Sequence, residues 1–258
     1  MSIKIGIPNR EIYNPLIEQF EQIKAEYDLQ LFRDTEDRLA ELFSKKKLDF
    51  AILNPIGYAN GIGIADYRIV QQTCLAYENY TGELSIYFNR NAHQFKSMAT
   101  AKETDYLTVI ARIILAERYD SFPEIKEMKV DLLTMLEKCD TAVVWQGSTG
   151  NDFALDISEN WFDTYEFPLP IGFWVCRADD HPEKINEIIA KLVNPKLPDE
   201  YPILEHFHVA DTEYERDGNV HYRWSEDIEA ALNETMQLLF VLNILEAVPE
   251  IKLLTKDV

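Results

Sequence analysis

One stretch indicates the fold class of this chain most clearly: Leu48-Asp-Phe-Ala-Ile-Leu-Asn-Pro-Ile-Gly-Tyr58. Residues 50–53 are all apolar, which predicts a strand that is buried on both faces rather than one with a face in water. A helical pattern leads into this strand, and Asn54 and Pro55 end it with a break that we expect to leave polar backbone groups exposed. A buried strand with a polar exit is typical of the rim of a binding cleft between two lobes.

Strand and helix patterns alternate on both sides of this stretch. Apolar strands are expected at residues 3–8 and 29–33, and Asn14 with Pro15 opens a helical pattern between them. Asp34 or Thr35 is expected to cap the helix that precedes residues 50–53. Alternation at this length predicts an α/β protein in which helices cover the faces of a sheet.

The second half of the chain continues the pattern with less regularity. Further strands are expected at residues 68–76, 82–89, 141–145 and 170–177, and helices at residues 108–119, 131–138, 182–192 and 225–247. The chain is expected to cross between lobes near Asn89 and near Gly172. This predicts lobe 1 at residues 1–88 and 174–258, and an inserted lobe 2 at residues 89–173. Mixed sheets flanked by helices, a central cleft and two crossover strands follow from that division.

Composition and charge restrict the partners. The 45 acidic and 25 basic residues give a formal net charge of -20, which disfavours nucleic acid and anionic membrane surfaces. The net charge does not exclude a small anionic ligand, because a local cluster of hydrogen-bond donors outweighs the electrostatic field of distant charges. We find no apolar run of membrane-spanning length and no secretory signal pattern in residues 1–8.

The cysteines point to a compartment. Cys74, Cys139 and Cys176 lie far apart in apolar surroundings, which predicts buried free thiols and a reducing environment. A cytoplasmic location is therefore expected, with the protein a monomer or homodimer.

Several short blocks occur in an order that resembles the chorismate dehydratases of the futalosine route to menaquinone. The quoted stretch is followed by Asp66-Tyr-Arg-Ile-Val, Tyr80-Thr-Gly-Glu-Leu-Ser-Ile-Tyr-Phe, Phe95-Lys-Ser-Met-Ala-Thr, Ile113-Ile-Leu-Ala-Glu-Arg-Tyr, and Trp161-Phe-Asp-Thr-Tyr-Glu-Phe-Pro-Leu-Pro-Ile-Gly-Phe-Trp-Val. A helix pair around residues 220–249 is also expected from the resemblance, which covers most of the chain.

The resemblance implies a fold and a reaction. The fold is that of type 2 periplasmic solute-binding proteins, with the ligand held between the lobes by loops at strand ends. The reaction removes water from chorismate and gives 3-enolpyruvoylbenzoate, and no metal or organic cofactor is expected. The chain departs from the family in its first loop, in residues 101–105, and at Trp145-Gln-Gly147, where the family has an aspartate.

Candidate site residues lie where strands are expected to end. Asn9, Arg10 and Glu11 follow the first strand; Arg10 is a candidate carboxylate clamp and Glu11 a candidate general base, while an exposed polar turn is the alternative. Asn14 belongs to the same loop, and Asn54 is either a ligand donor or a turn former.

The remaining candidates lie in the second half of the expected cleft. Thr81 and Gly82 offer a hydroxyl and backbone donors, or form an ordinary tight turn. Thr104 is the expected cap of the helix at residues 108–119 and Lys102 a counter-ion for a bound anion, with Gln146 and Ser148 after another buried strand.

Other pairs have a structural interpretation. His206 and His208 share a face, but no third metal ligand is recognisable in sequence. Trp161 and Trp174 are expected in the core or at a hinge rather than as stacking platforms.

The sequence therefore predicts a two-lobed protein that binds a small carboxylate, with two functions left open. One is a chorismate dehydratase-like lyase in which Glu11 acts as the base. The other is a non-catalytic solute-binding or sensing protein of the same fold. The pathway's other enzyme of this superfamily, which cleaves cyclic futalosine, is disfavoured because its early Cys-Pro-Asn-Asp run is missing.

Overall fold

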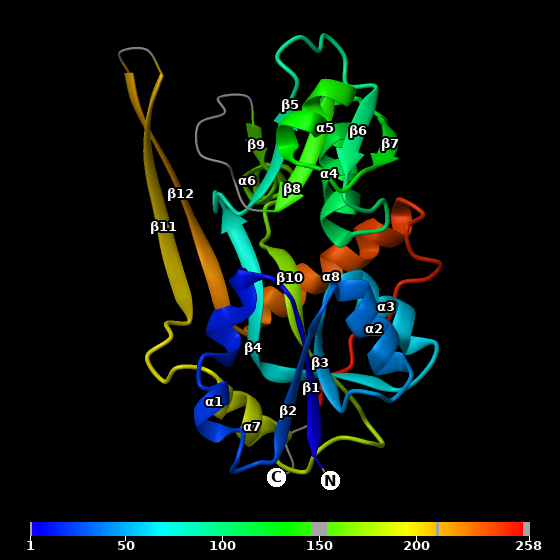
Figure 1. The fold of residues 1–258 in the computed structure, drawn as a ribbon, viewed down its shortest axis with the longest axis vertical. Helices are drawn as coiled ribbons and strands as arrows, with labels where there is room; N and C mark the ends of the chain where they lie inside the picture. Colours follow the sequence, from blue (N-terminus) through cyan, green and yellow to red (C-terminus); the bar gives the residue numbers. More distant parts are fainter. Residues whose placement is uncertain (1, 146–153, 210–211, 255–258) are drawn as a thin grey trace. The chain divides into compact units, whose positions relative to one another are not determined.

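Two compact units make up the chain in a computed structural model that describes residues 2–145, 154–209 and 212–254 (Figure 1). Unit 1 comprises residues 1–76, 170–201 and 221–258, and unit 2 comprises residues 77–169 and 202–220. The expected divisions lay at residues 88/89 and 173/174, so each falls later in the sequence than the division that the contacts define. The strand β4, Tyr67–Asn79, runs continuously through the first division. Residues 202–220 also belong to unit 2, which was not predicted from the sequence.

The strands of the described residues form two sheets. The larger has the order β11-β12-β4-β10-β3-β1-β2, and the smaller has the order β7-β6-β8-β5-β9. Unit 1 contains β1 (Ile3–Pro8), β2 (Leu29–Asp34), β3 (Phe50–Leu53) and most of β10 (Leu169–Arg177). Both parallel and antiparallel pairs occur, so the predicted mixed α/β architecture is confirmed.

Three neighbouring strands of unit 1 run parallel. β1 pairs with β2 from Ile3↔Leu29 to Pro8↔Asp34, and β1 pairs with β3 at Ile5↔Phe50. β10 lies antiparallel on the other side of β3 and places Phe173 opposite Leu53. All residues of β3 are buried, as the apolar run at residues 50–53 predicted.

Helix starts in unit 1 follow the capping chemistry of the sequence. Thr35 caps α2 (Glu36–Ser44) and accepts from the Arg38 backbone nitrogen. Asn54 caps α3 (Pro55–Ile62), with Pro55 in the first turn, where a missing N–H costs little. The expectation of exposed backbone after residue 53 is therefore wrong, because Asn54 is 7% exposed and its side-chain oxygen satisfies the helix start.

Several boundaries differ from the sequence prediction. The loop after β1 contains a 3-10 helix, η1 (Glu11–Ile17), and then the short α1 (Phe20–Ile23). Helix α7 (Ile185–Leu192) begins after Pro182, and α8 (Glu226–Val241) ends before Ala247, with Ser225 as its cap. The expected helix pair at residues 220–249 is also wrong, since residues up to 223 belong to a strand.

Unit 2 is built on the smaller sheet. Its strands are β5 (Leu84–Phe88), β6 (Ser97–Thr100), β7 (Glu124–Glu127), β8 (Thr141–Trp145) and β9 (Ala154–Asp156). Its helices are α4 (Tyr106–Tyr119), α5 (Leu132–Lys138) and α6 (Ile157–Tyr165). The strands β11 (Glu200–Val209) and β12 (Thr212–Arg223) bring residues 202–220 to this unit.

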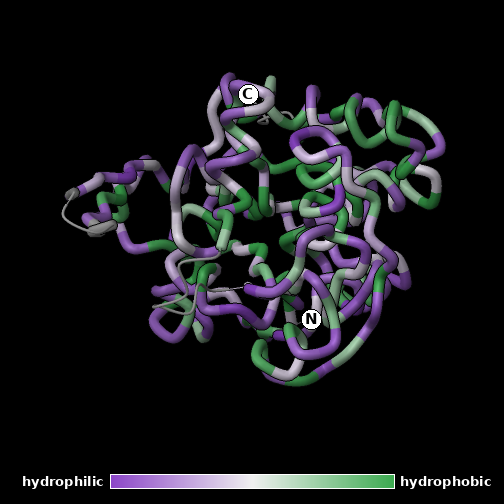
Figure 2. Tube along the Cα trace, turned by 90° about the horizontal axis from the view of Figure 1, so that it is seen from above, coloured by the Kyte–Doolittle hydropathy of each residue, from purple (hydrophilic) through white to green (hydrophobic). Residues whose placement is uncertain are grey.

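Core positions agree with the sequence in both units. Trp161, Trp174 and the three cysteines are buried, and the Trp174 ring nitrogen donates to Thr73 Oγ1 at 3.0 Å. Figure 2 shows the corresponding pattern along the trace, where short hydrophobic stretches alternate with hydrophilic ones. Among the helices of the described residues, none has both the length and the apolar character needed to span a membrane.

Candidate functional site

The carboxyl ends of β1, β2 and β3 meet at one edge of the sheet in unit 1. Because the three strands run parallel, the residues that follow them emerge side by side at this edge. Asn9 and Arg10 follow β1, Glu36 comes shortly after β2, and Asn54 follows β3. Open α/β sheets bind ligands outside the carboxyl ends of their strands, so this edge is the candidate site of unit 1.

Glu36 is the centre of the polar contacts at this edge. Its Oε2 accepts from Asn54 Nδ2 at 2.5 Å, and its Oε1 accepts from the Tyr13 hydroxyl at 3.4 Å. Arg10 Nε lies 3.8 Å from the same Oε1. The Glu36 side chain is only 7% exposed, whereas that of Arg10 is 32% exposed. A buried carboxylate after β2 thus contacts residues from two other segments, the one after β1 and the one after β3.

Arg10 and Asn54 were predicted from the sequence, whereas Glu36 and Tyr13 were not. Tyr13 is fully buried, and Gly172 of β10 leaves the space that its ring occupies: a Cβ at Gly172 would lie 3.0 Å from Tyr13 Cε1 and 2.8 Å from Ile52 Cγ2. The available signal for Glu36 was its place directly after a helix cap, at the end of the second strand.

The other predicted residues of unit 1 lie in more open positions. Glu11 is exposed at the first residue of η1, and Asn9 is exposed while its backbone nitrogen donates to Asp34. Asn14 is also exposed, and its Oδ1 accepts from Arg33 at 2.8 Å. The structure therefore brings Arg10 and Asn54 together through Glu36, and Asn14 to a second arginine.

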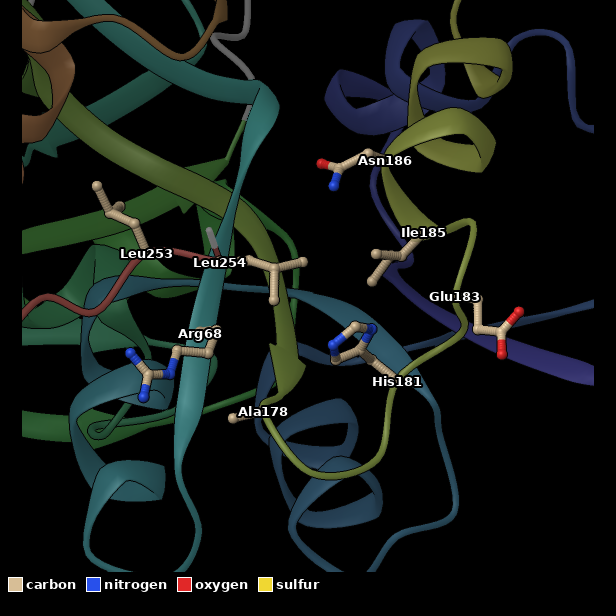
Figure 3. Close-up of a pocket in the computed structure, with 8 residues that line it drawn as sticks. All are labelled: Arg68, Ala178, His181, Glu183, Ile185, Asn186, Leu253 and Leu254. Atoms are coloured by element: carbon tan, nitrogen blue, oxygen red, sulfur yellow. The ribbon is translucent and has the colours of Figure 1, made fainter. Parts of the chain in front are cut away.

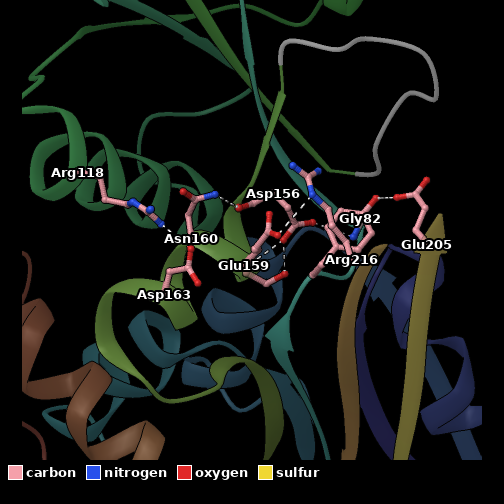
Figure 4. A network of polar contacts seen from close by, with 10 residues as sticks. Gly82, Arg118, Asp156, Glu159, Asn160, Asp163, Glu205 and Arg216 are labelled. Carbon is pink, nitrogen blue, oxygen red and sulfur yellow. Dashed lines mark hydrogen bonds and ion pairs between the residues drawn. The ribbon is translucent and has the colours of Figure 1, made fainter. Parts of the chain in front are cut away.

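In unit 2, Gly82 belongs to a polar network around Asp156 (Figure 4), and the neighbouring Thr81 joins this network through Ser158. Asp156 Oδ2 accepts from the Gly82 backbone nitrogen at 2.8 Å, and Oδ1 accepts from the Ser158 hydroxyl at 2.6 Å. The Thr81 and Ser158 hydroxyls are 2.8 Å apart. Asp156 also caps α6 through Glu159 N. Of the groups expected to face a ligand, the Gly82 backbone nitrogen thus donates to Asp156, and the Thr81 hydroxyl is hydrogen-bonded to Ser158.

Burial governs the acidity of this network. It raises the pKa of Asp156 above its ordinary value, and the hydrogen bonds from Ser158, Glu159 and Gly82 act in the opposite direction. Burial likewise raises the pKa of Glu159, against the favourable charge of Arg216 at 3.5 Å. Arg216 also lies over the Tyr80 ring, whose hydroxyl donates to Glu205.

The start of α4 differs from the prediction. The cap position is Asp105, not Thr104, and the helix begins at Tyr106. Thr104 and Lys102 are exposed, and the Lys102 carbonyl accepts from the Thr108 hydroxyl at 3.0 Å. The expectation failed because the helix begins one residue later than a Thr104 cap requires. Gln146 and Ser148 lie outside the described residues.

His206 and a cavity in unit 1 are two further features of the described residues. His206 Nδ1 lies 3.3 Å from Glu215 and 3.7 Å from Glu213, but the described residues contain no group of three side chains suited to a metal ion. A cavity of about 290 Å³ lies in unit 1 beside β4, α7 and the segment at Leu253 (Figure 3). None of the predicted site residues lines it.

A comparison with known protein families identifies the family to which this chain belongs. The family model described as menaquinone biosynthesis matches residues 8–197, which is most of the chain. The chain belongs to the menaquinone biosynthesis family. The family resemblance seen in the sequence is therefore confirmed, and the carboxyl edge of unit 1 lies within the matched residues.

Solved structures establish the fold of this family member. Protein AF1704 from Archaeoglobus fulgidus is 13% identical, with a TM-score of 0.62, covering 95% of this chain and 98% of that one. The periplasmic aliphatic sulphonate binding protein SsuA from Escherichia coli is 9% identical, with a TM-score of 0.55, covering 100% and 95%. The predicted periplasmic-binding-protein fold is confirmed. A search of curated protein sequences gave no significant match.

Proposed function

We propose that this member of the menaquinone biosynthesis family is a chorismate dehydratase-like lyase of the futalosine pathway. The observation that carries the proposal is the family match over residues 8–197. It is supported by a polar edge in unit 1 that presents a guanidinium, a carboxylate and a side-chain amide. Chorismate is a small dicarboxylate with a ring hydroxyl, so it needs cationic and hydrogen-bonding groups of these kinds.

The proposed reaction breaks two bonds between ring carbons of chorismate and their substituents, and the ring itself stays intact. A C–H bond breaks at the carbon that carries the enolpyruvyl ether, and the adjacent C–O bond breaks as the hydroxyl leaves. The proton and the hydroxide together make one water, no electrons are exchanged with another molecule, and the ring becomes aromatic. The enzyme's task is therefore to orient the ring, to accept one proton and to assist the departing hydroxyl.

Residues of the carboxyl edge are assigned to these tasks in the proposal. Arg10 binds a substrate carboxylate, because a planar guanidinium matches its two oxygens. Glu11, exposed on η1 directly after Arg10, takes the ring proton. Asn9 and Asn14 of the same segment supply further polar contacts to the substrate.

The experiment is turnover of chorismate by the purified protein, followed by mass spectrometry for a product lighter by one water. The wild type is expected to convert chorismate, and Glu11→Gln to lose about a hundredfold or more of kcat, the range seen when a general base is removed. Glu21→Gln is the matched control, since Glu21 is an exposed glutamate on the next helical segment that pairs with Lys24.

Two results would count against the proposal in different ways. Full activity in Glu11→Gln would remove Glu11 as the base and leave the reaction standing. No turnover by the wild type, together with a rise in melting temperature on adding chorismate, would favour a protein that binds the ligand unconverted. The fold likeness to SsuA, a binding protein, makes that second outcome the relevant competitor.

A further inference from the structure

We propose that Glu36 is a positioning residue for the site in unit 1, which orients Arg10 and thereby sets the affinity for a carboxylate substrate. The inference rests on the proposed function, because it assumes that Arg10 binds the substrate. It assigns a role to a residue that carries no such role in the sequence resemblance.

The burial of Glu36 is the first observation. Its side chain is 7% exposed, although it is an acidic residue in the first turn of α2. Glu41 of the same helix is 41% exposed and pairs with Arg38 and Lys45 at the surface. A carboxylate is buried at low cost only where charges and donors compensate it, so the surroundings of Glu36 are built around its charge.

The two oxygens of Glu36 have separate tasks. Oε2 accepts from Asn54 Nδ2 at 2.5 Å, and Oε1 faces both the Tyr13 hydroxyl at 3.4 Å and Arg10 Nε at 3.8 Å. One oxygen is thus tied to the end of β3, and the other meets the segment that follows β1. The carboxylate links the two strand ends where the substrate is expected.

Asn54 and Tyr13, two of the partners named above, are also held by groups other than Glu36. The Asn54 side-chain oxygen is held by the Gly57 backbone nitrogen at 2.8 Å, so a shift of Asn54 would uncap α3. The ring of Tyr13 is fully buried against Gly172, where even a Cβ would collide with it. Because Asn54 and Tyr13 cannot move freely, Glu36 transmits the geometry of the core to the more exposed Arg10.

The net charge of the molecule explains why the orientation of Arg10 matters for binding an anion. With a formal net charge of -20, long-range electrostatics repel an anionic substrate, and binding depends on a local cation in a defined orientation. A guanidinium whose Nε faces a fixed carboxylate loses less rotational freedom when it binds a second carboxylate.

The test compares Glu36→Gln with Glu41→Gln as the matched control. An amide has one acceptor oxygen and one donor nitrogen, so glutamine at position 36 cannot both accept from Asn54 and pair with Arg10. We expect Glu36→Gln to raise KM for chorismate about tenfold or more with a smaller change in kcat, and Glu41→Gln to change neither. An unchanged KM in Glu36→Gln would overturn the inference.

A double variant separates positioning from a general loss of structure. If Glu36 acts through Arg10, Glu36→Gln adds no further increase in KM when Arg10→Ala is already present. An equally large increase in that background would mean that Glu36 acts elsewhere. Should Glu36→Gln fail to fold, Glu36→Asp carries the same two comparisons, because it keeps the charge but withdraws it by one carbon.

A measurement without turnover keeps this inference distinct from the proposed function. In protein labelled with ¹⁵N-arginine, the Arg10 Nε–H resonance, assigned by its loss in Arg10→Ala, should shift or broaden in Glu36→Gln and stay in place in Glu41→Gln. If the wild type does not turn over chorismate, the proposed function fails while this resonance still decides the pairing. If the wild type turns over chorismate but the Arg10 Nε–H resonance is unchanged in Glu36→Gln, the positioning role of Glu36 is refuted and the proposed function is not.

Discussion

The Asn54 side-chain nitrogen donates a hydrogen bond to Glu36 Oε2 at 2.5 Å, while the Asn54 side-chain oxygen accepts one from the Gly57 backbone nitrogen at 2.8 Å. One amide therefore caps a helix and fixes a buried carboxylate at the carboxyl edge of the parallel strands. The sequence separates Asn54 from Glu36 by eighteen positions, and only the pairing of β1 with both β2 and β3 brings them together.

Asn54→Asp tests this contact without removing the cap, because aspartate is itself a good cap residue. A second carboxylate would then face Glu36, so the two would share a proton and the pKa of one would rise. The variant should be less stable than Asn54→Ser by about 1–3 kcal/mol at neutral pH. The deficit should shrink as the pH falls, since protonation removes the repulsion. Urea unfolding at about pH 5 and about pH 8 measures this, and equal stability of the two variants at the higher pH would contradict the contact.

Gly172→Ala tests the packing of Tyr13. The added Cβ would lie 2.8 Å from Ile52 Cγ2 and 3.0 Å from Tyr13 Cε1, closer than carbon atoms normally approach. We expect a loss of about 1–3 kcal/mol in the free energy of unfolding. Gly63→Ala is the control, because nothing lies within 4 Å of its added Cβ. The packing described for Tyr13 is wrong if the two alanine variants unfold at the same urea concentration.

Thr81→Val tests whether the Thr81 hydroxyl serves the Asp156 network. The substitution keeps the shape and removes the hydrogen bond to Ser158, with both side chains buried. The expected cost is about 1 kcal/mol in unfolding free energy. Thr104→Val, at an exposed threonine of the same unit, should change stability by less than about 0.5 kcal/mol. A cost no larger at Thr81 than at Thr104 would argue against the network.

We expect the buried thiols to lower the free energy of unfolding at alkaline pH. Burial raises the pKa of Cys74 and of Cys176 to about 12, from an ordinary value of 9.0. Because the folded state keeps these protons longer than the unfolded state does, the stabilisation is complete below pH 9.0 and is lost as the pH rises towards about 12. Cys74→Ser should remove one group's share of this slope, at most about 1.4 kcal/mol per pH unit. Equal slopes for wild type and variant between about pH 9 and about pH 10 would refute the assignment.

Much of the fold was predictable where a local pattern determines the structure. The apolar run at residues 50–53 became β3, and the strand at residues 141–145 was predicted to its exact ends. The start of the helix expected from residue 225 was predicted to within one residue, because the Ser225 cap and the helical pattern after it are local features. The long pair β11 and β12 was missed, since prolines and charged residues obscure the alternation on which strand prediction depends.

The site was predictable only in part. Arg10 and Asn54 were found because polar residues at strand ends are visible in sequence, whereas Glu36 looked like an ordinary first-turn glutamate. Its burial depends on Tyr13 and Gly172, which come from distant segments of the chain. Asp156 was missed for a related reason: its role depends on Thr81 and Gly82, which approach it only when β5 pairs with β9.

The proposed dehydration is tested most directly by a proton NMR time course of chorismate with the wild-type protein. We expect aromatic signals to replace the ring signals of chorismate while the vinyl protons of the enolpyruvyl group remain. The rate should be proportional to the protein concentration. If the spectrum of chorismate stays unchanged at high protein concentration while chorismate raises the melting temperature of the protein, the protein is not a dehydratase but a binding protein.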